Sequence, residues 1–195
     1  MPYTLRAPSP TDSSPLATLM TTSRWSDPHW RSLFAPSTTL TAAIAQTSAR
    51  NPRNLTSGRD GKRHQIAIDD ETGEIVGYAR WILPPTEGGA GEGRVIWPEA
   101  IVREAISEEK VEFERMYKSS CDSQGRMALM NWTLMPHRNT PLEVADAEFE
   151  AEHGPYMTLD YLSVAPAWQR RGIGRMLLRK GLEVADREGL SLIHI

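Results

Sequence analysis

The chain has 195 residues, a length typical of one compact domain. Its 39% hydrophobic and 24% charged residues are enough to build a buried core and exclude global disorder. The 22 basic and 25 acidic residues leave a net charge of −3, which excludes nucleic-acid binding through overall charge. A single cysteine, Cys121, excludes an internal disulfide and a multi-cysteine zinc cluster. With neither a signal peptide nor an apolar run of about 20 residues, the sequence predicts a soluble, cytoplasmic protein with no membrane partner.

The first half of the chain predicts a strand, two helices and a hairpin. Residues 3–6 alternate like a short strand, Ser14 and Pro15 read as a helix start, and Ala-rich residues 37–50 predict a second helix. Residues 51–64, with proline, glycine and several arginines, predict a solvated loop. Strands over 65–69 and 75–83, joined by a turn that ends in Gly73, predict an antiparallel hairpin.

Residues 86–155 read as an insertion into this domain, whose core is then 1–85 and 156–195. Its first eight residues are almost all Gly, Ala and Glu, and Pro98 opens a helix predicted to reach about Lys118. Residues 128–134 fit either a strand or the tail of a helix. Thr140 and Pro141 then predict the start of a short helix that stops near Gly154.

The segment that carries chemistry follows the insertion. Residues 156–165 predict a strand that ends at Pro166, and residues 175–188 predict an amphipathic helix closed by Gly189. A helix N-terminus leaves N–H groups unpaired and carries partial positive charge, so a glycine-rich turn before it suits a pyrophosphate. The turn between the strand and the helix consists of Gln169, Arg170, Arg171, Gly172, Ile173 and Gly174.

The spacing within this turn excludes two common phosphate loops. A dinucleotide fingerprint needs a third glycine where Leu177 stands, and a P-loop needs Gly-Lys-Ser/Thr where the chain has Gly174-Arg175-Met176.

Val164-Ala165-Pro166 followed by the turn from Gln169 to Gly174 resembles the Gln/Arg-x-x-Gly-x-Gly/Ala coenzyme A loop of the GNAT superfamily of N-acetyltransferases. The specific resemblance covers residues 156–189, and the long insertion is similar to fungal members. It implies an α/β fold with a mixed, mostly antiparallel central sheet flanked by helices. It also implies acetyl-CoA as co-substrate, a primary amine of a small molecule or peptide as acceptor, and direct attack by that amine.

The resemblance also implies roles for individual residues. Leu162, Ser163 and Val164 would offer backbone bonds to the pantetheine arm, and a backbone N–H near Leu162 would polarise the thioester carbonyl. The pyrophosphate would lie on the amides from Arg170 to Gly174, a stretch that includes Arg171, Gly172 and Ile173, with Gln169 opening the motif.

An alkylammonium must lose a proton before it attacks, and a carboxylate or a histidine is the usual acceptor. Asp160 is the first candidate, because period-two counting places it on the same strand face as Val164. Glu152 and His153 are weaker candidates, and a structural role is an alternative for all three. The other histidines and Cys121 lack metal-ligand spacing, so no metal is expected.

Members of this family normally continue through a further helix and strand. Residues 191–195 read as the start of a further strand, so the chain is expected to be truncated, with the last elements and the usual general-acid tyrosine missing. A module that binds coenzyme A without turnover is the alternative to an enzyme, and the glycine loop cannot separate the two.

Overall fold

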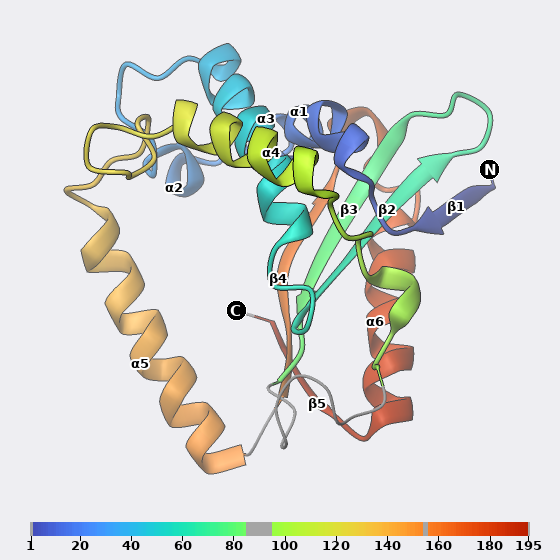
Figure 1. Ribbon diagram of the computed structural model, residues 1–195. Helices are drawn as coiled ribbons and strands as arrows, with labels where there is room; N and C mark the ends of the chain where they lie inside the picture. The colour runs from blue at the N-terminus through green and yellow to red at the C-terminus, as the bar shows by residue number, and fades with distance from the viewer. Residues whose placement is uncertain (1, 85–94, 154–155, 195) are drawn as a thin grey trace.

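A computed structural model of the protein describes residues 2–84, 95–153 and 156–194. One sheet of five strands, in spatial order β1-β2-β3-β4-β5, forms its centre (Figure 1). Neighbouring strands are antiparallel except for β4 and β5, which are parallel. The predicted mixed, mostly antiparallel sheet is therefore confirmed. The strands are β1 (Tyr3–Arg6), β2 (Lys62–Asp69), β3 (Ile75–Ile82), β4 (Tyr156–Val164) and β5 (Ser191–His194).

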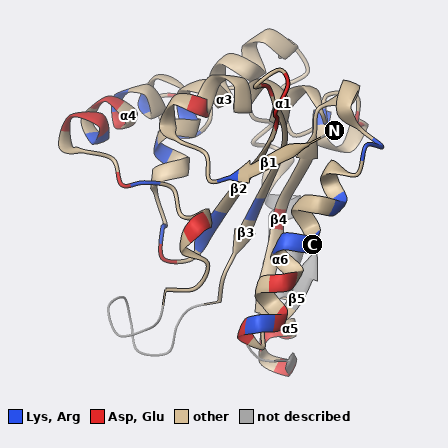
Figure 2. Cartoon of the chain, turned by 90° about the vertical axis from the view of Figure 1, so that its right-hand side faces the viewer, with Lys and Arg blue, Asp and Glu red and all other residues tan. Residues whose placement is uncertain are grey.

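Helices cover both faces of this sheet. Figure 1 shows α1, α3 and α4 on one side, α6 on the other, and α5 extending away from the sheet. Figure 2 shows basic and acidic residues interspersed along α4 and α6, as their i,i+3 and i,i+4 ion pairs require. The helices are α1 (Ser13–Thr22), α2 (Pro28–Arg31), α3 (Leu40–Thr56), α4 (Ser107–Ser119), α5 (Met135–His153) and α6 (Ile173–Glu188).

Each covered face has its own apolar core. Under α6, Trp81 and Met157 are fully buried with Leu177, while Ile66 and Tyr78 pack with Leu16 on the α1 face. Two glycines let α6 approach the sheet closely. A Cβ on Gly181 would lie 2.2 Å from Trp81 Cζ2, and one on Gly77 would lie 2.7 Å from Ile173 Cγ2.

The predicted hairpin is confirmed, with Gly73 at φ +72° in the turn. The prediction of a loop over residues 51–64 is wrong for most of this range, because α3 continues to Thr56 and β2 begins at Lys62. Pro52 lies inside α3, where proline ordinarily costs about 3 kcal/mol. Leu55 is buried in the α1-side core one turn later, and the Asn51 amide donates to Ser13 O at 3.2 Å. These tertiary contacts extend the helix past the proline.

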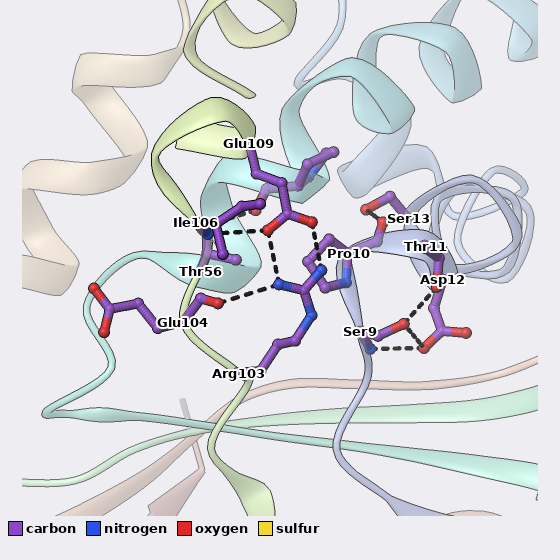
Figure 3. A network of polar contacts seen from close by, with 11 residues as sticks. Ser9, Pro10, Thr11, Asp12, Ser13, Thr56, Arg103, Glu104, Ile106 and Glu109 are labelled. Carbon is purple, nitrogen blue, oxygen red and sulfur yellow. Dashed lines mark hydrogen bonds and ion pairs between the residues drawn. The ribbon is translucent and has the colours of Figure 1, made fainter. Parts of the chain in front are cut away.

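Two helix starts differ from prediction (Figure 3). The first helix begins at Ser13, after a 3₁₀ turn in which the Asp12 carboxylate accepts from Ser9 N at 2.7 Å. In the insertion, Pro98 opens only a short 3₁₀ turn, and α4 starts at Ser107. There the Glu109 carboxylate accepts from Ile106 N at 3.1 Å, which satisfies a free N–H at the helix start.

The rest of the insertion departs further from the predicted pattern. Residues 128–134 form turns with an isolated bridge from Met130 to Phe34, so neither a strand nor a helix tail is present there. The following helix, α5, begins at Met135 and places Pro141 in its interior, not at its first position. The Gly/Glu-rich stretch of residues 86–93 lies outside the described residues.

Candidate functional site

The glycine-rich turn places the start of α6 against open space. Gly172 is the N-cap residue with φ +83°, and Arg170 also has positive φ, +61°. The helix starts at Ile173, two residues before the predicted start, and its first N–H groups have no partner within the helix. A Cβ on Gly172 would meet no protein atom within 4 Å, whereas one on Gly174 would contact Val164 Cγ2 at 3.6 Å. Gly172 is therefore the position where a ligand could approach the backbone.

Charge surrounds this helix start. Arg170, Arg171 and Arg175 are all exposed, and the Arg171 guanidinium lies 4.7 Å from the centroid of the Trp168 ring. Three cations at one helix N-terminus favour a polyanion.

The neighbouring edge of β4 is open to an added strand along its second half. Strand β5 pairs only with Tyr156–Leu159, so within the described residues no strand covers β4 from Asp160 onward on that side. The Leu162 carbonyl accepts from Arg24 Nη2 at 3.0 Å, and the Val164 carbonyl accepts from Gln169 Nε2 at 3.3 Å. The main-chain polar groups of both residues thus face the edge.

Ser163, the third predicted contact of this edge, faces other partners. It is paired with Tyr78, and backbone alternation directs its main chain toward β3. Its hydroxyl accepts from Ser23 Oγ at 3.1 Å. Of the three predicted residues, Leu162 and Val164 present the backbone groups that an added strand-like ligand could use.

A β-bulge at Asp160 changes which face the strand's side chains reach. Trp81 pairs with Leu159 and Arg80 pairs with Tyr161, so Asp160 is the extra residue. Val164 packs on the α6 side, but the Asp160 carboxylate forms an ion pair with Arg80 on the α1 side. The period-two count that grouped Asp160 with Val164 is wrong, because the bulge interrupts the alternation.

The α1 side of β4 also lines a pocket of about 210 Å³ that sequence reasoning did not find. Its walls come from α1, α2, α3, β3, β4 and residues 127–130, so part of the insertion lines the pocket. Arg50 and Arg80 are its charged residues. Tyr161 separates the pocket from the β4 edge; burial raises its pKa, and its phenol donates to Met20 O at 3.0 Å.

The remaining candidates lie elsewhere. Glu152 is exposed near the end of α5, and the side chain of His153 is outside the described part of the chain. Burial, with repulsion from Arg80, lowers the pKa of His64 to about 3, so this imidazole is neutral, and its Nδ1 lies 2.9 Å from the Tyr78 hydroxyl. Among described residues no cluster of His, Cys, Asp and Glu could hold a metal ion. Within that same part of the chain, no helix is long and apolar enough to cross a membrane.

Comparisons with known proteins find solved structures of similar fold. A structure from Corynebacterium glutamicum, described as histone acetyltransferase HPA2 and related acetyltransferase, aligns with 95% of this chain and 72% of its own at 15% identity and a TM-score of 0.51. A Trypanosoma brucei acetyltransferase aligns with 100% of this chain and 82% of its own at 14% identity, TM-score 0.44. The aminoglycoside N-acetyltransferase AAC(6')-Iy, solved with CoA, aligns with 100% of this chain and 76% of its own at 13% identity and a TM-score of 0.43.

No curated protein sequence matches the chain. The model of the acetyltransferase (GNAT) family matches residues 27–195, a span that includes the hairpin, β4, the glycine turn and α6. The chain therefore belongs to the GNAT acetyltransferase family.

Proposed function

We propose that the protein is an acetyl-CoA-dependent N-acetyltransferase that acetylates a primary amine of a small molecule or peptide. The observation that carries this proposal is the open N-terminus of α6, capped by Gly172, directly after the strand whose edge is uncovered. Membership of the family supports acetyl transfer. The open glycine cap and the exposed arginines around it suit the pyrophosphate of coenzyme A. The proposed location is the cytoplasm.

Two parts of the chain would hold coenzyme A. The amides from Arg170 to Gly174 and the nearby guanidinium groups would bind the pyrophosphate, because they combine unpaired N–H groups with positive charge. The backbone groups of Leu162 and Val164 would bind the pantetheine arm as a strand edge binds an added strand, with the arm replacing the Arg24 and Gln169 side chains on the two carbonyls. Bound coenzyme A supplies the activated acetyl thioester.

The protein would then stabilise charge and accept a proton. A main-chain N–H at Leu162 would donate to the carbonyl oxygen that gains negative charge during attack by the amine. Asp160, two residues earlier in β4, would accept the proton from the amine, directly or through water. Its ion pair with Arg80 holds the carboxylate at this position. The amine attacks the thioester carbonyl directly, the carbon–sulfur bond breaks, and coenzyme A leaves as a thiolate that is protonated from solvent, so no side chain forms a covalent intermediate.

The second candidate function is a module that binds coenzyme A without turnover. The exposed glycine cap supports ligand binding under both functions, so binding alone does not distinguish them. The distinguishing experiment measures thiol released from acetyl-CoA in the presence of a panel of primary amines, together with the thermal shift caused by coenzyme A. We expect release that depends on the amine. A thermal shift without release for any amine would refute the enzyme and favour the binding module.

A further inference from the structure

The pocket on the α1 side of β4 has an unusual balance of charge. Its lining includes Arg50 from α3 and Arg80 from β3 but no acidic side chain. The charge of Arg80 is compensated by its ion pair with Asp160. No carboxylate among the described residues forms an ion pair with Arg50, and its buried Nε has no hydrogen-bond partner there. A partly buried cation whose Nε has no partner is costly, so this pocket is suited to an anion at the Arg50 guanidinium.

The surroundings of Arg50 disfavour a cation without a counter-ion. Burial lowers the pKa of Arg50, and the positive charge of Arg80 also lowers it. An incoming carboxylate would relieve the repulsion between Arg50 and Arg80 and would satisfy the Arg50 guanidinium with charge-assisted hydrogen bonds.

The rest of the lining suits a short carbon skeleton. Trp30, Leu33 and Phe34 form an apolar wall from α2 and the residues after it, and three methionines from two segments complete it. A volume of about 210 Å³ is below the range of about 300–1,000 Å³ typical of sites for drug-sized ligands. The pocket thus combines space for a small molecule, apolar walls and one uncompensated cation. The methionines are Met20, Met127 and Met130.

We propose that the acceptor is a small amine that also carries a carboxylate, with the carboxylate bound by Arg50 and the amine directed past Tyr161 toward the edge of β4. This inference rests on the proposed acetyltransferase function and narrows its acceptor class. Tyr161 provides the connection, because it lines the pocket and immediately precedes Leu162, whose carbonyl lies on that edge.

The test compares amino acids with their carboxamides, which have nearly the same shape but no negative charge. Acetyl transfer is measured for leucine, 4-aminobutyrate and 6-aminohexanoate against the three amides, so that the spacing between amine and carboxylate also varies. We expect kcat/KM for at least one acid to exceed that of its amide at least tenfold. Arg50→Gln should reduce the ratio of kcat/KM for the acid to that for the amide to about one. Arg50→Lys keeps the charge but loses the planar guanidinium that can donate two parallel hydrogen bonds, so it should reduce the ratio only partly.

Arg53→Gln is the matched control. Arg53 is on the same helix, one turn later, but its guanidinium pairs with Glu114 at 2.7 Å and does not line the pocket. This variant should keep the wild-type preference for the acid. Because Arg50→Gln removes a partly buried cation that no described carboxylate pairs with, its melting temperature should equal or exceed that of the wild type, which checks that the variant is folded.

The outcomes separate this inference from the proposed function. Equal or faster transfer to the amides by the wild type would overturn the carboxylate inference and leave the acetyltransferase intact. Preference for phosphoethanolamine over every carboxylate would also overturn it. If no amine is acetylated although coenzyme A binds, the proposed function fails, and binding of the acids is then measured by thermal shift. A shift with the acids but not the amides would support the anion pocket, and no shift with either would overturn it.

Discussion

Replacing Gly172 with leucine tests the coenzyme A site most directly. Gly172 has φ +83°, so leucine would occupy a left-handed conformation that costs about 1–2 kcal/mol. For a domain of this size we expect the melting temperature to fall by roughly 2–8 °C. No protein atom lies within 4 Å of the added Cβ, so no collision within the protein adds to this cost. The side chain would instead fill the space in front of the helix amides.

The predicted loss of affinity is larger than the loss of stability. A hydrogen bond to a charged group contributes about 1.5–3 kcal/mol, so blocking two amides should raise the Kd for coenzyme A about 100-fold or more, as measured by calorimetry. Gly189→Leu is the matched control. Gly189 caps the other end of α6 with φ +66° and is equally open around its Cβ, so the variant should lose similar stability and no affinity. If Gly172→Leu and Gly189→Leu bind coenzyme A equally well, the site is not at this helix start.

Three further predictions concern the core and the reaction. The folded-state pKa of His64, about 3, lies below its unfolded value of 6.5, so the unfolded chain binds the proton first and stability falls as pH drops from 6.5 toward 3. At about 1.4 kcal/mol per pH unit, urea titrations should show that the free energy of unfolding falls by roughly 2 kcal/mol between pH 6.5 and pH 5. His64→Gln should remove this loss. An unchanged pH slope in that variant would contradict the prediction. Gly181→Ala places a Cβ 2.2 Å from the buried Trp81, so the overpacking should outweigh the gain in helix propensity and lower the free energy of unfolding by about 2 kcal/mol. A variant as stable as the wild type in urea would show that α6 can shift away from the sheet without cost. Asp160→Asn should lower kcat about 10²–10⁴-fold with little change in the KM for acetyl-CoA, and a loss below tenfold would place the base elsewhere.

The elements with strong local signals could be predicted from the sequence. The hairpin around Gly73, the strand before Pro166 and the helix closed by Gly189 were all found, because turn glycines, a strand-ending proline and apolar periodicity depend on neighbouring residues. The glycine turn was placed for the same reason. Its spacing was enough to indicate the family.

Features set by distant contacts could not be predicted. Helix α3 continues through Pro52 because Leu55 reaches the core, which propensity does not report. The bulge at Asp160 depends on the register with β3, and the pocket around Arg50 forms only when five other segments meet it. A buried arginine on a helix has no distinctive signal in a single sequence.

The bulge at Asp160 makes one strand serve two sites. Before it, Leu159 belongs to the core beneath α6; after it, Tyr161 faces the pocket, while Leu162 packs toward α6 and offers its backbone to the edge. Because Asp160 is accommodated as an extra residue, Tyr161 and Leu162 lie on the faces they would have if they followed Leu159 directly. The same residues in a strand without the bulge would place Tyr161 toward α6 and Leu162 toward the pocket. The bulge thus sets the phase between the wall of the pocket around Arg50 and the edge that would hold the cofactor.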